Sequence, residues 1–294
     1  MIPIAKPLIG KEEKKAVSEV LSSEIIASGP KTEEFEKKFA KFVGTKYAIT
    51  STSGTTALHL SLLSLGIKKG DEVIVPSFTF IASANTVIFC DAKPVFCDVD
   101  PRTFNIDPGK IKKLITKKTK AIMPVHMYGQ PADMKPISET AKKHGLYVIG
   151  DAAQAHGASY NKKKIGSFGN LECFSFYPTK NMTTGEGGML TTNNKEIFER
   201  AMSIRNHGRS KTKWGYEHKR IGYNYRITDI TAAIGLEQLK KLPKFNKKRK
   251  QNANFLNKNL ENIEIPYVIK NAEHVYHQYT IKCKKRERLI KALK

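Results

Sequence analysis

Seven short apolar runs, rich in β-branched and aromatic residues, alternate with longer segments of helical periodicity between residues 47 and 192. The runs are YAIT, EVIVP, PVFCDV, KAIMPV, YVIGD, CFSF and GMLTT, at 47–50, 72–76, 94–99, 120–125, 147–151, 173–176 and 188–192. Between them, residues 55–66 and 133–145 carry apolar residues at helical spacing and end in glycine. This alternation predicts an α/β domain in which helices flank a mainly parallel, seven-stranded sheet, a three-layer sandwich.

The pattern changes after residue 193. Residues 227–242 and 248–260 are typical of helices on either side of Pro243, 279–283 (YTIKC) of a strand and 285–293 of a helix. We therefore expect a large domain over residues 1–230, with its first residues free to pack on a small α+β domain over 231–294. One strand and one helix form a thin domain, so we expect the small domain to be incomplete.

The charge is strongly positive, with 51 Lys and Arg against 27 Asp and Glu and a formal net charge of +24. Such a balance is found in nucleic-acid-binding proteins. Here most of the basic residues are lysines, whereas arginine makes the bidentate contacts to phosphates and bases. The composition therefore favours a solvated lysine surface, or attraction of a small diphosphate-bearing substrate, over nucleic-acid binding.

The cysteines at 90, 97, 173 and 283 form no CxxC pair and no Cys/His group with zinc spacing. We therefore expect neither a disulfide scaffold nor a metal site. No run approaches the roughly 18 apolar residues of a membrane span, and the first 15 residues lack the apolar run of a signal peptide. These features favour a cytoplasmic protein without a membrane partner.

Three segments carry polar residues directly after predicted strands, where α/β sheets bind ligands. In TSTSGTTAL, Ser53, Gly54 and Thr55 lie at a predicted helix N-terminus, where free N–H groups and hydroxyls can hold a phosphate. An ordinary helix cap explains the same residues. The segment matches neither GxGxxG nor GxxxxGK[ST], which argues against a dinucleotide fold and a P-loop.

Asp151 follows the second of these strands, with Gln154 three residues later. A carboxylate there can hold a positive charge on a ligand, or it can cap a helix. Ser175 and Lys180 belong to the third segment, FSFYPTKNMTTGEGG, where a partly desolvated lysine can form an imine with an aldehyde. A phosphate cradle, a carboxylate for a pyridinium nitrogen and a lysine for an aldehyde are what pyridoxal 5′-phosphate (PLP) requires.

Seven motifs, in their order along the chain, resemble the DegT/DnrJ/EryC1/StrS aminotransferases. They are TSTSGTTAL, VPSFTFIASAN, PVFCDVD, MPVHMYGQPADM, GDAAQAHGA, FSFYPTKNMTTGEGGM and IGYNYRITDITAAIGLEQL. Members of this family are PLP enzymes that aminate nucleotide-activated keto sugars and have the aspartate aminotransferase-like fold of PLP transferases, fold type I. Some relatives replace the lysine by histidine or add an iron–sulfur cluster; Lys180 and the lack of a cysteine cluster favour transamination.

The resemblance implies a role for each matched residue. Lys180 matches the lysine that forms the imine, Asp151 the partner of the ring nitrogen and Gln154 the residue near the ring hydroxyl. Gly54, Thr55 and Ser175 match the phosphate contacts, and Phe80 matches the aromatic residue that stacks on the ring. Asn224 matches the residue that reaches the phosphate from a neighbouring subunit. The last match implies an obligate homodimer with shared active sites.

The implied reaction moves an amino group from L-glutamate to a nucleotide-linked keto sugar, with Lys180 as general base and acid. A 4-keto-6-deoxy sugar aminated at C4, as in perosamine, is our expectation, for surface polysaccharide or glycan biosynthesis. His126, Tyr128 and Arg220 are candidates for contacts with the sugar nucleotide.

Family members continue past the point that corresponds to residues 286–294, which adds to the expectation of an incomplete small domain. This leaves two alternatives beside the active enzyme. One is a truncated homologue that binds PLP with little catalysis. The other is a basic, non-enzymatic protein that binds nucleic acid.

Overall fold

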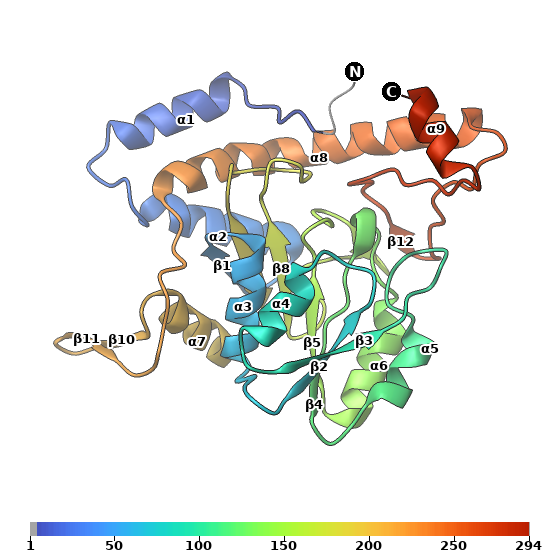
Figure 1. Cartoon of the computed structure of the whole chain (residues 1–294). Coiled ribbons are helices and arrows are strands. Elements are labelled where there is room, and N and C mark those ends of the chain that lie inside the picture. The colour runs from blue at the N-terminus through green and yellow to red at the C-terminus, as the bar shows by residue number, and fades with distance from the viewer. Residues whose placement is uncertain (1–4, 294) are drawn as a thin grey trace.

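The computed structural model describes residues 5–293, and its centre is a seven-stranded sheet (Figure 1). The strands are β1 (Tyr47–Ser51), β2 (Glu72–Pro76), β3 (Lys93–Cys97), β4 (Thr119–Ile122), β5 (Tyr147–Asp151), β8 (Leu171–Ser175) and β9 (Gly188–Thr192). Their order is β1-β9-β8-β5-β4-β2-β3. β9 runs antiparallel to β1 and β8, and the other neighbours are parallel. The prediction of a mainly parallel, seven-stranded sheet is confirmed.

Helices cover both faces of this sheet. Within residues 5–293 the helices are α1 (Lys11–Leu21), α2 (Pro30–Val43), α3 (Gly54–Ser64), α4 (Ala82–Ile88), α5 (Pro108–Ile111), α6 (Met134–His144), α7 (Lys195–Arg205), α8 (Asp229–Asn259) and α9 (Arg286–Leu293), and α1 packs on α8 rather than on the sheet. Side chains of α2, α5, α6 and α8 join a larger core, and those of α3, α4 and α7 a second one. Along β2, Ile74 belongs to the larger core while Val73 and Val75 belong to the second, as alternation across a strand requires. The fold is a three-layer sandwich.

Smaller elements surround the main sheet. A hairpin joins β10 (Arg209–Thr212) to β11 (Gly215–His218), and a short sheet has the order β12-β6-β7, with β6 at Ser159–Tyr160, β7 at Lys163–Lys164 and β12 at Ala272–Glu273. Short 3₁₀ turns cover Lys112–Leu114 and Met127–Gly129. No helix within residues 5–293 is both long and apolar enough to cross a membrane.

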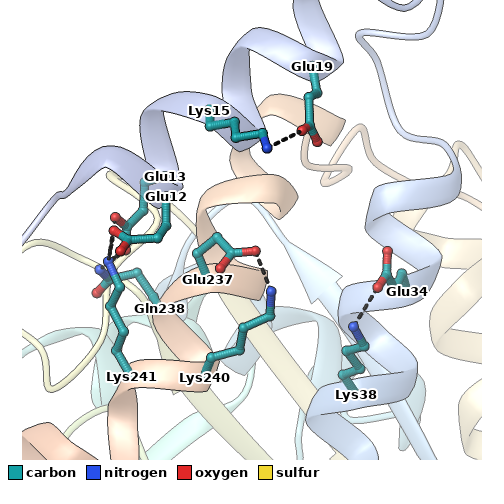
Figure 2. A network of polar contacts seen from close by, with 10 residues as sticks. All are labelled: Glu12, Glu13, Lys15, Glu19, Glu34, Lys38, Glu237, Gln238, Lys240 and Lys241. Carbon is teal, nitrogen blue, oxygen red and sulfur yellow. Dashed lines mark hydrogen bonds and ion pairs between the residues drawn. The ribbon is translucent and has the colours of Figure 1, made fainter.

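The N-terminal helix α1 is held against α8 by a buried carboxylate (Figure 2). Glu13 accepts hydrogen bonds from Lys241 Nζ at 2.7 Å and from Gln238 Nε2 at 2.8 Å. At the start of α8, Asp229 accepts hydrogen bonds from the backbone N–H groups of Gly29, Lys31 and Thr32 and so caps α2. Three polar side chains on α8, those of Asp229, Gln238 and Lys241, therefore hold the first two helices.

The C-terminal region departs from the sequence-based prediction in two places. α8 runs without a break through Pro243, although proline lacks the N–H that a helix interior uses. The strand predicted at 279–283 is wrong: within residues 5–293 the segment pairs only through an isolated bridge between Lys282 and Glu264, so it has no neighbouring strand. The helix predicted at 285–293 is confirmed as α9.

Candidate active site

A cavity of about 520 Å³ lies at the carboxyl ends of the parallel strands. The loops that follow β1, β2, β4, β5 and β8 all contribute to its wall. The predicted cofactor contacts that line it are Ser53, Gly54, Thr55, Phe80, Asp151, Gln154, Ser175 and Lys180. Segments more than 120 residues apart in the sequence thus meet in one cavity, at the edge of the sheet where the strand pattern predicted a site.

The N-terminus of α3 forms one wall. Ser53 caps it, since its Oγ accepts a hydrogen bond from the N–H of Thr56 at 3.1 Å. The N–H groups of Gly54 and Thr55 have no acceptor within residues 5–293. A Cβ on Gly54 would lie 2.6 Å from Cβ of Ser175, so only glycine allows this close approach. Two free N–H groups and the hydroxyl of Ser175 suit a phosphate, so these residues serve both as helix cap and as anion cradle.

Asp151 closes the opposite side of the cavity at the end of β5. Its side chain is almost completely buried. Oδ2 accepts a hydrogen bond from Ser83 Oγ at 2.8 Å, and Oδ1 accepts one from the N–H of Ala153 at 3.1 Å. A buried carboxylate held from both sides presents a fixed negative charge, which suits a cationic ring nitrogen.

Lys180 is the cationic residue of this cavity. Burial lowers the pKa of its ammonium group, and the charge of Asp151 opposes that shift. A lowered pKa increases the fraction of neutral amine, the form that attacks an aldehyde and accepts a proton. A lysine with a lowered pKa beside a buried carboxylate gives the cavity a nucleophile and a counter-charge.

Phe80 and Gln154 complete the predicted set. The side chain of Phe80 is 70% exposed at the cavity wall, so its ring is available to stack on a ligand. Gln154 Oε1 accepts a hydrogen bond from the N–H of Tyr128 at 2.7 Å. Its amide nitrogen donates to no group within residues 5–293 and can therefore donate to a ligand oxygen.

The chain matches the sequence model of the DegT/DnrJ/EryC1/StrS aminotransferase family over residues 7–294. It belongs to this family. GDP-perosamine synthase of Caulobacter vibrioides is 45% identical over 286 residues, which are 96% of this chain and 77% of that protein. The dTDP-3-amino-3,4,6-trideoxy-alpha-D-glucose transaminase of Streptomyces venezuelae is 39% identical over 282 residues, 95% of this chain and 74% of that protein.

The fold agrees with that of solved family members. The PLP form of the sugar aminotransferase Spr1654 of Streptococcus pneumoniae superposes with a TM-score of 0.93 at 29% identity and covers 99% of this chain and 82% of that one. The family resemblance and the PLP-transferase fold inferred from the motifs are thus confirmed. In this family fold, the cavity described above lies beside the end of β5 and the N-terminus of α3.

Four residues proposed as contacts lie outside the cavity wall. His126 is completely buried and hydrogen-bonded within the protein, away from the cavity wall, and the sugar contact expected there stays a prediction. Tyr128 lines a neighbouring cleft that shares Gln278 with the cavity. Arg220 is exposed, and Asn224 forms an isolated bridge with Asn206.

His277 is a cavity residue that the sequence analysis missed. Its side chain is 8% exposed, and its Nδ1 is buried without a partner within residues 5–293. Burial, with the charges of Lys180 and Arg249, lowers the pKa of His277 to about 2, so the imidazole is neutral. The signal available in the sequence was the density of His and Tyr in HVYHQY, residues 274–279, for which the sequence analysis made no site prediction.

Proposed function

We propose that the chain is a PLP-dependent aminotransferase that moves an amino group from L-glutamate to a nucleotide-linked keto sugar. The observation that carries the proposal is the convergence of Gly54, Asp151, Ser175 and Lys180 on one cavity. Family membership supports the same class of reaction. Each of these side chains or N–H groups offers the partner that one part of PLP requires.

The cavity fits PLP on physical grounds. The unpartnered N–H groups of Gly54 and Thr55, with Ser175, would hold its phosphate, and Asp151 would hold the ring nitrogen in its protonated form. Bound there, PLP supplies an aldehyde that exchanges amino groups and a ring that accepts the electrons of a broken C–H bond. Phe80 would pack against the ring, and Gln154 would donate a hydrogen bond near its hydroxyl.

Lys180 carries the proton transfers in this proposal. Its Nζ, neutral in part because burial lowers its pKa, takes the proton from the carbon that bears the amino group of the donor. The resulting ammonium, stabilised by the nearby carboxylate of Asp151, would pass this proton to the cofactor carbon that carries the transferred amino group within the same half-reaction, and Lys180 would move a proton in the opposite direction when the keto sugar is aminated. Because donor and keto sugar use one cavity in turn, ping-pong kinetics follow.

The substrate class rests on the relatives. A GDP-perosamine synthase is among the most similar proteins, and we propose a 4-keto-6-deoxy sugar nucleotide aminated at C4, for surface polysaccharide biosynthesis in the cytoplasm. A dTDP-3-amino sugar transaminase is also similar, so the alternative is amination at C3. Tyr128, in the cleft beside the cavity, and Arg220 remain our candidates for sugar-nucleotide contacts.

We also propose that the enzyme is a homodimer in which Asn224 reaches the phosphate site of the partner. Large apolar side chains before, on and directly after α4 are exposed; they are Phe78, Phe80, Ile81, Ile88 and Phe89. Contiguous exposed apolar residues of this kind mark interaction surfaces. Their position beside the cavity would bring a second subunit close to the bound cofactor.

An absorbance spectrum with PLP, recorded before and after L-glutamate is added, tests the proposal. We expect a visible band in the wild type that changes on addition of glutamate, and its loss in Lys180→Ala. Lys195→Ala, a substitution of an exposed lysine on α7, is the matched control and should keep the band. A folded wild-type protein without the band would refute the proposal; salt-sensitive binding to random DNA in the same preparation would favour the nucleic-acid alternative.

A further inference from the structure

A buried His–Glu pair lies next to the end of β5, outside the cavity. Nε2 of His126 is 3.1 Å from Oε2 of Glu172, and neither side chain is exposed. Oε1 of Glu172 has no hydrogen-bond partner within residues 5–293. Burying a carboxyl group with an unpartnered oxygen is costly, so the pair calls for a role that offsets the cost.

A backbone N–H group determines which ring nitrogen of His126 carries the hydrogen. Its Nδ1 accepts a hydrogen bond from the N–H of Ala132 at 3.0 Å, so the neutral ring carries its hydrogen on Nε2 and donates it to Glu172. A second proton on the ring would break the bond from Ala132. The contact is therefore a hydrogen bond from a neutral imidazole and not an ion pair.

Glu172 meets no positive charge to offset its own. Burial raises the pKa of its carboxyl, the hydrogen bond from His126 opposes that rise, and the charge of Asp151 adds to it. The net direction is upward, so the protonated form, which glutamine mimics, is favoured more than in an exposed glutamate.

The carboxyl of Glu172 fits closely against β5. Glu172 on β8 pairs with Gly150 on β5, the residue before Asp151. A Cβ at Gly150 would lie 1.9 Å from Oε2 of Glu172, so any side chain there would force the buried carboxyl to move. Glu172 thus lies against the backbone that carries Asp151.

His126 links this position to a second cavity residue. Its backbone N–H donates to the carbonyl of Asp151 at 3.0 Å, and its ring closes the segment 126–132 through the bond from Ala132. Within that segment, the N–H of Tyr128 donates to Oε1 of Gln154 at 2.7 Å. The backbone N–H of His126 therefore holds the end of β5, while its ring contacts Glu172 and closes the segment that orients Gln154.

We infer that His126 and Glu172 are positioning residues, which hold Asp151 through the end of β5 and Gln154 through the segment 126–132. The inference is independent of which sugar is aminated. It depends on the proposed PLP site only for its spectroscopic test, because the mobility of the segment can be measured without cofactor.

Two pairs of variants separate positioning from general destabilisation. His126→Gln loses the acceptor for Ala132, and His126→Asn keeps that acceptor but loses the donor to Glu172. Glu172→Leu loses the acceptor for His126, whereas Glu172→Gln keeps it. In the full chain without cofactor, we expect hydrogen exchange in a peptide covering 126–132 to rise at least tenfold in His126→Gln, His126→Asn and Glu172→Leu, and to stay within about threefold in Glu172→Gln.

The same variants are then loaded with PLP, and the pH midpoint of the visible band is measured. We expect the midpoint to move by at least half a pH unit in His126→Gln and Glu172→Leu, because Asp151 and Gln154 are displaced from the ring. Glu13→Gln, at a buried carboxylate between α1 and α8, is the matched control and should change neither readout.

Unchanged exchange and an unchanged midpoint in a folded His126→Gln would overturn the inference, whatever the folding of Glu172→Leu. So would equal effects in His126→Gln and Glu13→Gln, since general loss of stability would then explain both. A chain that never shows a PLP band refutes the proposed function, yet the exchange measurement still decides whether the pair holds the segment 126–132.

Discussion

Gly54 sets how closely the N-terminus of α3 approaches Ser175. A methyl group at this position would lie 2.6 Å from Cβ of Ser175, so Gly54→Ala must push the two walls of the phosphate cradle apart. We expect PLP affinity to fall at least tenfold, about 1.4 kcal/mol, with little change in folding. Gly109→Ala, at an exposed helical glycine of α5, should leave the titration unchanged; equal affinity in Gly54→Ala would contradict the cradle.

The charge of Asp151 raises the pKa of Lys180 against the effect of burial. Asp151→Asn removes that charge, so the pKa of Lys180 should fall further and neutral amine should persist to lower pH. We expect the rate of PLP capture, followed by the visible band in rapid mixing, to have its pH midpoint lowered. Ser83→Ala keeps the charge and loses one hydrogen bond, and its midpoint should remain near that of the wild type.

A site residue could be predicted from the sequence where its position near the end of one strand was enough to place it in the cavity. Asp151 and Lys180 follow apolar runs directly, and parallel strands bring such positions to one edge. His126 follows a strand in the same way, yet its ring points to Glu172, 46 residues further on, which fits only because residue 150 is a glycine. His277 enters the cavity from a segment without regular structure, whose path no local pattern specifies.

At the scale of elements, local periodicity predicted α3, α6 and α9 and most strands of the sheet within a few residues. Pro243 does not end α8, because buried residues on both sides of it, Leu242 and Asn246 among them, hold the helix in place. The segment 279–283 has the composition of a strand, but it forms only an isolated bridge. A strand also needs a neighbouring strand to pair with, and the residues of a short apolar run do not show whether such a neighbour exists.

The docking of α1 on α8 should depend on pH. Contacts with Lys241, the backbone and Gln238 overcome burial and lower the pKa of Glu13 from 4.5 to about 2. Because the pKa of Glu13 is lower in the folded than in the unfolded protein, its ionised carboxylate stabilises the fold above about pH 4.5. This stabilisation is at most about 3 kcal/mol and is lost as the pH falls toward 2.

Denaturant unfolding between pH 7 and pH 3 measures this dependence. We expect Glu13→Gln to be less stable than the wild type at pH 7, and the difference between the two proteins to shrink toward pH 3. A difference that stays constant over this range would show that ionisation of Glu13 does not hold α1 against α8.

For the whole molecule, the exposed side chains around α4 are the strongest indication that one chain is not the complete enzyme. The side chain of Phe89 is 57% exposed, and Phe89→Asp would place a charge in the proposed interface. We expect this variant to sediment as a monomer and to hold PLP less tightly, since the partner's phosphate contact is lost. Phe255→Asp, at a side chain 65% exposed on α8, should remain a dimer; a monomeric wild type would refute the shared site.

The contact between Gly150 and Glu172 also restricts how this family member can change over evolutionary time. Any side chain at position 150 would occupy the space that the Glu172 carboxyl fills. A larger residue at position 150 would displace the buried Glu172 carboxyl unless position 172 has become smaller first, whereas a smaller residue at 172 needs no prior change. Substitutions at these two positions have a preferred order, and related sequences should contain the pair of a small residue at 172 with glycine at 150, but not glutamate at 172 with a larger residue at 150.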